Sequence, residues 1–214
     1  MVIFDFDGVI INSHNLQMCA LKHSYSMFFD DNNIPYEEFF FNSGRSLNDI
    51  FRDMGFPEQM VGEYQQFSID NIDKIKVYDG VVRIIKKLYE SGTKCALCTG
   101  KDRKRTLQIL RLFELEKYFC CVVCSDDVAN PKPHPESIYK IAGEFADDEY
   151  CIVGDGVNDL ICGKNAEMYV RAIAVTWGDT SYEVLKTVQS DHFVHTADEL
   201  EELMISLGYI RQSE

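Results

Sequence analysis

Short apolar runs and amphipathic stretches alternate along most of the chain. The runs are rich in Val, Ile, Cys and aromatic residues, which is typical of buried strands. The strands expected from them are residues 2–6, 94–98, 119–124, 150–155, 171–176 and 192–194. Apolar residues recur at helical spacing between these runs, as they do from Val81 to Leu88. The helices expected there are residues 79–92, 102–115, 135–145, 157–168, 180–188 and 197–208, with Asp102 as an N-cap and Gly92 at a helix end.

This alternation predicts βαβ units, and therefore a parallel sheet with helices on both faces. Residues 14–77 interrupt the pattern after the first strand, because they are rich in Phe, Tyr, Asn and Asp and have helix-like spacing. We expect an α/β fold, in which residues 1–13 and 78–214 form a doubly wound, Rossmann-like core. Residues 14–77 would be a helical cap inserted after the first strand. In such sheets, ligands bind beyond the carboxyl ends of the strands.

The composition and net charge of the chain limit the partners that it could bind. The chain has 214 residues and a net charge of −14, from 21 basic and 35 acidic residues. Nucleic acid and anionic membrane surfaces would repel such a chain, so we expect neither as a partner. We find no apolar run of about 20 residues and no secretory signal. Eight cysteines without such a signal favour reduced thiols, and we expect a cytoplasmic protein. The sequence does not indicate an oligomeric state.

Two Cys-x-x-Cys pairs raise the question of a zinc ribbon. They are Cys95 with Cys98, and Cys121 with Cys124. Both pairs lie within predicted strands, where residues i and i+3 point to opposite faces of the sheet. One strand therefore cannot direct both of its sulfurs toward one tetrahedral zinc ion. We interpret these cysteines as small hydrophobic residues of two neighbouring strands.

Polar and charged residues gather just beyond the predicted strands. They are Asp5 and Asp7 after the first strand, Thr99 and Gly100 after the second, Lys132 beyond the third, and Asp155 and Asp159 after the fourth. Carboxylates that lie together resist ionisation unless a cation neutralises them, and Mg²⁺ prefers oxygen ligands. Hydroxyl, amide and ammonium donors facing carboxylates through a metal are typical of phosphoryl transfer.

This set of motifs resembles the haloacid dehalogenase-like hydrolase superfamily. The matching motifs are D-x-D-G at 5–8, T-G at 99–100, the lysine of P-K-P at 132, and G-D-x-x-x-D at 154–159. The insertion after the first strand is similar to the cap of the phosphoglycolate phosphatase and β-phosphoglucomutase branch. Further similarity to that branch lies in SGRSLNDIF (43–51) and PKPHP (131–135).

The resemblance implies a catalytic role for four side chains. Asp5 would be the nucleophile that forms an aspartyl-phosphate. Asp7 would protonate the leaving alcohol and then activate water. Thr99, together with the backbone amide of Gly100, would bind phosphate oxygens, and Lys132 would neutralise the nucleophile and the phosphoryl group.

The resemblance also implies a Mg²⁺ cofactor. Its ligands would be Asp5, the backbone carbonyl of Asp7, and Asp155, while Asp159 would orient a metal-bound water. Dehalogenases of the superfamily lack the second Asp of D-x-D, because a halide leaving group needs no proton. The presence of Asp7 therefore indicates phosphoryl transfer.

Substrate selection is expected from the cap and from the loops that face it. The candidates are Asn12, Ser13, Gln17, Gly44, Arg45, Ser46, Lys101 and Arg103. Closure of the cap would exclude water and complete the site.

The function expected is a Mg²⁺-dependent phosphatase for a small phosphorylated metabolite, either phosphoglycolate-like or a sugar phosphate. A phosphomutase of the β-phosphoglucomutase type is the first alternative. Such mutases carry a His where the cap begins and an Arg shortly after the cap glycine, where this chain has Gln17 and Leu47. A non-catalytic protein that binds a phosphorylated metabolite is the second alternative.

Overall fold

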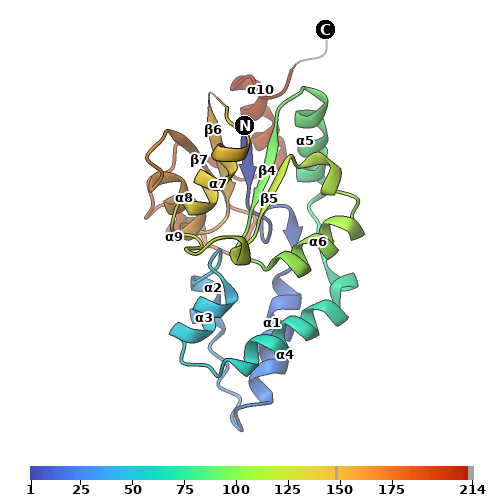
Figure 1. The fold of residues 1–214 in the computed structure, drawn as a ribbon, viewed down its shortest axis with the longest axis vertical. Helices are drawn as coiled ribbons and strands as arrows, with labels where there is room; N and C mark the ends of the chain where they lie inside the picture. The colour runs from blue at the N-terminus through green and yellow to red at the C-terminus, as the bar shows by residue number, and fades with distance from the viewer. Residues whose placement is uncertain (148, 212–214) are drawn as a thin grey trace.

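Six parallel strands form the central sheet of the protein (Figure 1). The computed structural model describes residues 1–147 and 149–211. The strand order is β5-β4-β1-β6-β7-β8, and every neighbouring pair is parallel. The bounds are β1 Val2–Phe4, β4 Cys95–Cys98, β5 Cys121–Val123, β6 Tyr150–Gly154, β7 Val170–Val175 and β8 His192–Val194. All six strands were expected from the apolar runs, and the expected parallel sheet is confirmed.

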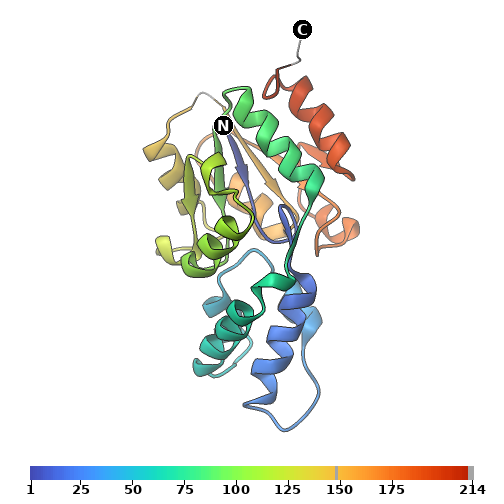
Figure 2. The ribbon, with the colours of Figure 1, turned by 90° about the vertical axis from the view of Figure 1, so that its right-hand side faces the viewer.

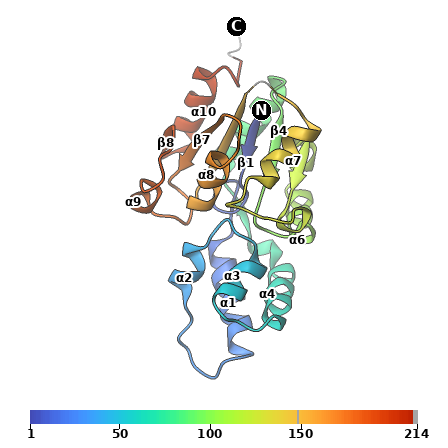
Figure 3. The same cartoon turned by 60° about the vertical axis from the view of Figure 1, so that its left-hand side comes forward.

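Helices cover both faces of this sheet, as Figure 3 shows for the face that carries α7 and α8. One face packs against α5 Asp79–Glu90, α6 Arg103–Leu112 and α10 Ala197–Ser206. The other packs against α7 Glu136–Glu144, α8 Val157–Lys164 and α9 Tyr182–Leu185. The doubly wound α/β architecture predicted from the sequence is therefore confirmed.

Local signals explain where these helices begin and end. Asp102 caps α6 as predicted, because its side chain accepts a hydrogen bond from the backbone N–H of Arg105. After α5, Gly92 has a φ of +76°, a left-handed conformation that glycine adopts without strain. The helix α9 is shorter than the expected 180–188. Only Leu185 of α9 is buried, so little packing supports a longer helix there.

Four helices form a separate lobe beyond the carboxyl ends of the strands (Figures 1 and 2). They are α1 His14–Ser26, α2 Tyr36–Phe41, α3 Leu47–Asp53 and α4 Gln59–Asp70. This lobe has its own core, in which the rings of Phe39, Phe51 and Tyr64 contact one another. The position of the lobe lets it cover the edge of the sheet where the predicted site residues lie.

A two-stranded antiparallel ribbon connects the lobe to the sheet. Its strands are β2 Ile11–Asn12, on the way into the lobe, and β3 Lys76–Val77, on the way out. The sequence pattern did not predict this ribbon, because two-residue strands are too short to show an alternation of apolar and polar positions. The ribbon holds the two connecting segments side by side.

The two Cys-x-x-Cys pairs lie on neighbouring strands, with β5 at the edge of the sheet. Cys95 packs in the hydrophobic cluster on one face of the sheet, and Cys98 packs in the cluster on the other. The side chains of Cys95 and Cys98 therefore point to opposite faces of the sheet, as expected, and cannot both bind one zinc ion. All eight cysteines are free thiols. Among the described residues, no helix combines the length and apolar character needed to cross a bilayer.

Candidate active site

The strand register brings the carboxyl ends of β1, β4 and β6 to one place. Phe4, the last residue of β1, is aligned with Leu97 of β4 and with Val153 of β6. The next residue, Asp5, continues the ladder by donating its backbone N–H to the carbonyl of Val153, at 2.9 Å. Thr99 likewise continues β4 by donating to Val123 of β5, at 3.0 Å. Side chains from three strand ends therefore face one edge of the sheet.

Lys132 connects two of the predicted carboxylates. Its Nζ lies 2.6 Å from Oδ1 of Asp5 and 2.5 Å from Oδ1 of Asp159, and it also donates to the carbonyl of Cys98 at 3.0 Å. All three charged side chains are buried. Burial alone would lower the pKa of Lys132, but the carboxylates of Asp159 and Asp5 outweigh it and raise that pKa well above its ordinary value. The lysine is therefore held as a cation.

We call Asp5, Asp155 and Asp159 the strand-end cluster. Each can place one carboxylate oxygen within 4.8 Å of the others, and all three side chains are buried. Burial, followed by repulsion from Asp159, raises the pKa of both Asp5 and Asp155 well above the ordinary carboxyl value. Lys132 offsets this effect at Asp5 only in part. The cluster holds more negative charge than its one lysine neutralises.

The donor set of this cluster fits Mg²⁺. Lys132 already occupies Asp159 and one oxygen of Asp5, whereas no cationic side chain among the described residues pairs with Asp155. The backbone N–H of Asp179 donates to Oδ2 of Asp155 at 2.8 Å and fixes the carboxylate. A Cβ at Gly8 would lie 2.1 Å from that same oxygen, so only glycine allows the D-x-D-G loop this close. Oxygen ligands with an uncompensated charge are those that Mg²⁺ prefers.

Three polar side chains surround Asp7 and hold one of its oxygens. Oδ1 of Asp7 accepts hydrogen bonds from Oγ of Ser13 at 2.5 Å and from Nε2 of Gln17 at 3.4 Å, and Nζ of Lys101 lies 3.0 Å away. Ser13, Gln17 and Lys101 were predicted as substrate contacts, and the structure brings all three to Asp7. The other oxygen of Asp7 accepts no hydrogen bond from a described residue.

A cavity of about 50 Å³ joins this group to the helical lobe. Asp5, Asp7, Thr99 and Gly100 line it from the sheet, and Gly44 and Arg45 line it from the lobe. A Cβ at Gly100 would lie 2.3 Å from the carbonyl oxygen of Arg45, so the loop before α3 rests directly on the phosphate-binding backbone predicted at Gly100. Nδ2 of Asn158 also donates to the carbonyl of Ser43, at 2.8 Å. The lobe therefore closes over the strand ends.

Three of the predicted substrate residues lie elsewhere. Asn12 is exposed in β2, and Ser46 caps α3 by accepting the backbone N–H of Asp49. Arg103 does not line the cavity. Its guanidinium donates instead to the carboxylate of Asp127 and to the carbonyl of Val122.

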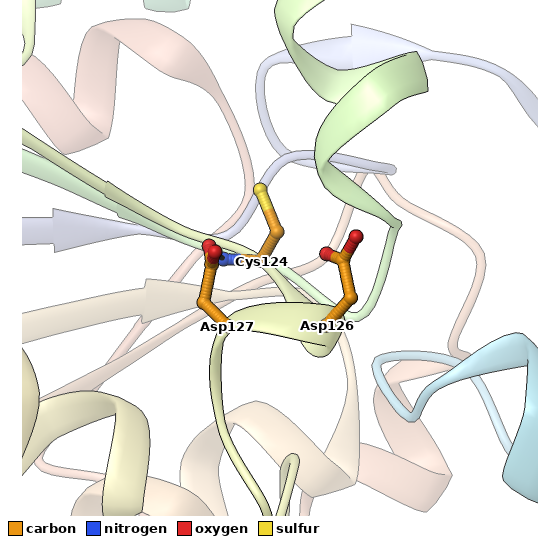
Figure 4. Close-up of side chains that lie close together, drawn as sticks. All are labelled: Cys124, Asp126 and Asp127. Atoms are coloured by element: carbon orange, nitrogen blue, oxygen red, sulfur yellow. Dashed lines mark hydrogen bonds between the residues drawn. The ribbon is translucent and has the colours of Figure 1, made fainter.

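The partner of Arg103 belongs to a second acidic group, Cys124, Asp126 and Asp127, which we call the turn cluster (Figure 4). Its side chains rise from the turn that follows β5. The carboxylate of Asp127 accepts the backbone N–H of Cys124, and that of Asp126 accepts the backbone N–H of Arg103. Burial raises the pKa of the Cys124 thiol to about 12, so the sulfur is not a thiolate ligand at neutral pH. These bonds organise a turn.

Sequence reasoning missed one cavity residue with a strong charge, Arg105, and its neighbour from the lobe, Tyr64. The guanidinium carbon of Arg105 lies 5.5 Å from the centroid of the Tyr64 ring. One signal pointed to Arg105: the first turn of the helix after the strand end that is predicted to bind phosphate contains three basic residues in succession, 103–105. Side chains of a helix point toward its N-terminus, which here lies next to the strand ends. At least one of the three basic side chains is therefore expected to face the strand ends.

A parallel sheet with clustered carboxylates and a buried lysine at its strand ends is the arrangement expected of a hydrolase that acts by phosphoryl transfer. The sequence model of the family described as haloacid dehalogenase-like hydrolase matches residues 2–175. This chain belongs to that family, and the resemblance stated from its motifs is confirmed.

Relatives and solved structures agree with this assignment. The chain is similar to proteins named pyrophosphatase PpaX from Bacillus cereus and Bacillus anthracis, at 31% and 30% identity, with 99% of this chain and 98% of each relative covered. A "predicted phosphatase" from Clostridium acetobutylicum shares the fold at a TM-score of 0.83 and 26% identity, covering 96% of this chain and 97% of that one. A hydrolase from Pseudomonas syringae has the same fold at a TM-score of 0.81 and 18% identity, covering 96% and 98%.

Proposed function

We propose that this protein is a Mg²⁺-dependent phosphatase that hydrolyses a small phosphorylated metabolite through an aspartyl-phosphate on Asp5. The observation that carries the proposal is the buried arrangement of Asp5, Lys132 and Asp155 at the strand ends, where Asp5 also lines the cavity under the lobe. The PpaX relatives and the family assignment support the same class of reaction. The cytoplasm is the compartment we propose, because all eight cysteines are free thiols.

Asp5 is the proposed nucleophile. Lys132 binds its Oδ1, whereas Oδ2 accepts no hydrogen bond from a described residue and keeps its lone pairs for attack on phosphorus. The ammonium of Lys132 also reduces the repulsion between the carboxylate and the approaching phosphate. The attack forms a bond between phosphorus and Oδ2 and breaks the bond between phosphorus and the leaving oxygen.

Asp7 is the proposed acid and base. It gives its proton to the leaving oxygen, and it then takes a proton from the water that attacks the aspartyl-phosphate and frees inorganic phosphate. Ser13, Gln17 and Lys101 hold Oδ1 of Asp7, so the carboxyl group cannot rotate away from the leaving group. Proton transfer runs through its other oxygen.

Asp5 and Asp155, with the backbone carbonyl of Asp7, are the proposed ligands of Mg²⁺. When bound, the ion supplies positive charge that stabilises the phosphoryl oxygens in the transition state. Asp159 is tied to Lys132 and to the backbone N–H of Gly156, so its role is to position the lysine and the loop after β6. Thr99 and the amide of Gly100 line the cavity and bind phosphate oxygens.

Two observations guide the choice of reaction and substrate. Gln17 and Leu47 both line the cavity, so the places that hold His and Arg in β-phosphoglucomutase-like enzymes here hold an amide and an alkyl group. This favours hydrolysis over mutase chemistry. The small cavity favours a compact substrate, and the first two to assay are pyrophosphate, from the name of the relatives, and phosphoglycolate.

The test measures inorganic phosphate released from an aryl phosphate with Mg²⁺, with a chelator, and in Asp5→Asn. We expect release to fall about 1,000-fold or more in Asp5→Asn and to stop in the chelator. Asp198→Asn is the matched control, since that carboxylate is on the surface, 82% exposed, and should keep wild-type activity. Release that persists in Asp5→Asn would refute the proposed nucleophile.

A further inference from the structure

Arg105 is a buried cation that faces the active-site cavity from the core side. It lies in the first turn of α6, and only 5% of the residue is exposed. It lines the cavity together with Asp7 and Lys101. None of the steps proposed above uses it.

The two arginines of the cavity differ in how their charge is used. Arg45 donates through Nη1 to Asn42 at 2.7 Å and through Nη2 to Asp53 at 2.5 Å, so residues of the lobe occupy both of its terminal nitrogens. Arg105 donates through Nε to Asp102 at 2.5 Å. No carboxylate among the described residues accepts a hydrogen bond from the two terminal nitrogens of Arg105, and Tyr64, whose side chain also interacts with the guanidinium, is uncharged.

The surroundings of Arg105 hold it in this orientation. Oδ2 of Asp102, which binds Nε, also accepts Nε2 of Gln65 from α4 at 3.2 Å. The ring of Tyr64, one residue earlier in α4, lies against the guanidinium. A planar guanidinium fixed through Nε presents its terminal nitrogens as a fork that matches the two oxygens of a carboxylate or phosphate.

We propose, on the basis of the phosphatase function above, that Arg105 binds a second anionic group on the leaving group of the substrate. A buried guanidinium with terminal donors that meet no carboxylate gains most from an anionic ligand. Lys132 and the metal serve the transferring phosphoryl group, and Lys101 is bound to Asp7, so Arg105 is the cation left for a distal charge. The cavity is small, so that charge lies within a few bonds of the phosphorus. The substrate class is a compact bis-anion, whose distal group is a carboxylate or a phosphate.

The test compares three substrates of similar size. Phosphoglycolate carries a distal carboxylate, pyrophosphate carries a distal phosphate, and 2-hydroxyethyl phosphate is the uncharged match for phosphoglycolate. We expect the wild type to prefer a bis-anion by kcat/KM. Arg105→Gln should lower that preference about 10- to 100-fold, as expected for lost charge-assisted hydrogen bonds, while kcat/KM for 2-hydroxyethyl phosphate changes little.

Two further variants separate specificity from folding. Arg105→Lys keeps the charge but loses the fork, so its preference should fall between those of wild type and Arg105→Gln. Arg111→Gln, on the same helix, removes an exposed arginine that pairs with Glu116, and it should behave as wild type. The bis-anion whose kcat/KM falls in Arg105→Gln identifies the distal group as carboxylate or phosphate.

Three results would overturn the inference. The first is an unchanged preference in Arg105→Gln. The second is an equal loss for substrates with and without a distal charge, which indicates that Arg105 only holds the lobe in place. The third is a wild type that hydrolyses 2-hydroxyethyl phosphate but neither bis-anion, which leaves the proposed phosphatase function standing. Absence of Mg²⁺-dependent hydrolysis of any ester would instead refute that function, and this inference with it.

Discussion

Two acidic groups of this protein have similar spacing, and they differ in how their charge is neutralised. In the turn cluster, the carboxylates cap backbone N–H groups, and the guanidinium of Arg103 pairs with Asp127. In the strand-end cluster, Lys132 is the one paired cation among the described residues, and Asp155 has none. Proximity of carboxylates is thus a weak sign of a metal site. Buried charge that the protein leaves uncompensated is the stronger one.

The pKa shifts of the two groups have opposite signs for this reason. Burial and repulsion from Asp159 raise the pKa of Asp5 and Asp155. Burial also acts to raise the pKa of Asp127, but the hydrogen bonds from Arg103 and from the backbone of Cys124 outweigh it, so that this pKa is lowered. One group is destabilised by its own charge, whereas the other is stabilised by its partners.

After Asp5→Asn, the largest effect is expected for Asp155→Asn. The change removes a proposed Mg²⁺ ligand while keeping the size of the side chain, so kcat/KM should fall about 100-fold or more. Saturating Mg²⁺ should stabilise the wild type by about 3 kcal/mol at 100 times Kd, measured by urea unfolding, and should stabilise the variant far less. An equal stabilisation of both proteins by Mg²⁺ would exclude Asp155 as a ligand.

A second, smaller effect is expected in the pH dependence of stability without metal. Since Asp5 and Asp155 have raised pKa values in the folded state, the folded protein binds more protons than the unfolded chain above the ordinary carboxyl value of 3.8. Their contribution to the free energy of unfolding is therefore present at low pH and is lost as pH rises through the folded-state pKa.

Urea unfolding in a chelator, followed from pH 5 to pH 8, checks this sign. The wild type should lose more stability over that range than Asp155→Asn, because the variant has one charge fewer to bury. Added Mg²⁺ should change the pH profile of the wild type far more than that of Asp155→Asn, since the ion keeps the carboxylates of the wild type ionised. Parallel pH profiles in the chelator would contradict the raised pKa values.

Most of the sheet, and the meeting of several site residues at its strand ends, could be predicted from the sequence. Buried parallel strands appear as short apolar runs, and residues that directly follow them must meet at one edge, which is why Asp5, Thr99 and Asp155 were found together. Lys132 and its pairing with Asp5 were expected from the motif, whereas its second carboxylate partner, Asp159, is visible only in three dimensions.

The side of the site that faces the lobe was predicted less well. Of the expected substrate residues, Arg45 lines the cavity but is bound to Asn42 and Asp53, and Arg103 is bound to the turn cluster. Arg105 was missed because residues 103–105 are all basic, and the sequence does not show which of them faces the cavity. Only the packing of α4 against α6 decides which of them faces the cavity.

The smallest effect on activity is expected for Asp127→Asn. The amide keeps one acceptor oxygen but loses the charge that binds Arg103 and the backbone N–H of Cys124, so stability should fall by about 1 kcal/mol. Asp126→Asn, which loses only an exposed bond to one backbone N–H, should cost less. Both variants should keep wild-type kcat/KM and wild-type stabilisation by Mg²⁺, because the carboxylates of the turn cluster bind Arg103 and backbone N–H groups and not a metal ion. Loss of Mg²⁺-dependent stabilisation in Asp127→Asn would mean that the turn cluster holds a metal ion. Neutralisation of Asp127 by Arg103 would then not distinguish the turn cluster from the strand-end cluster.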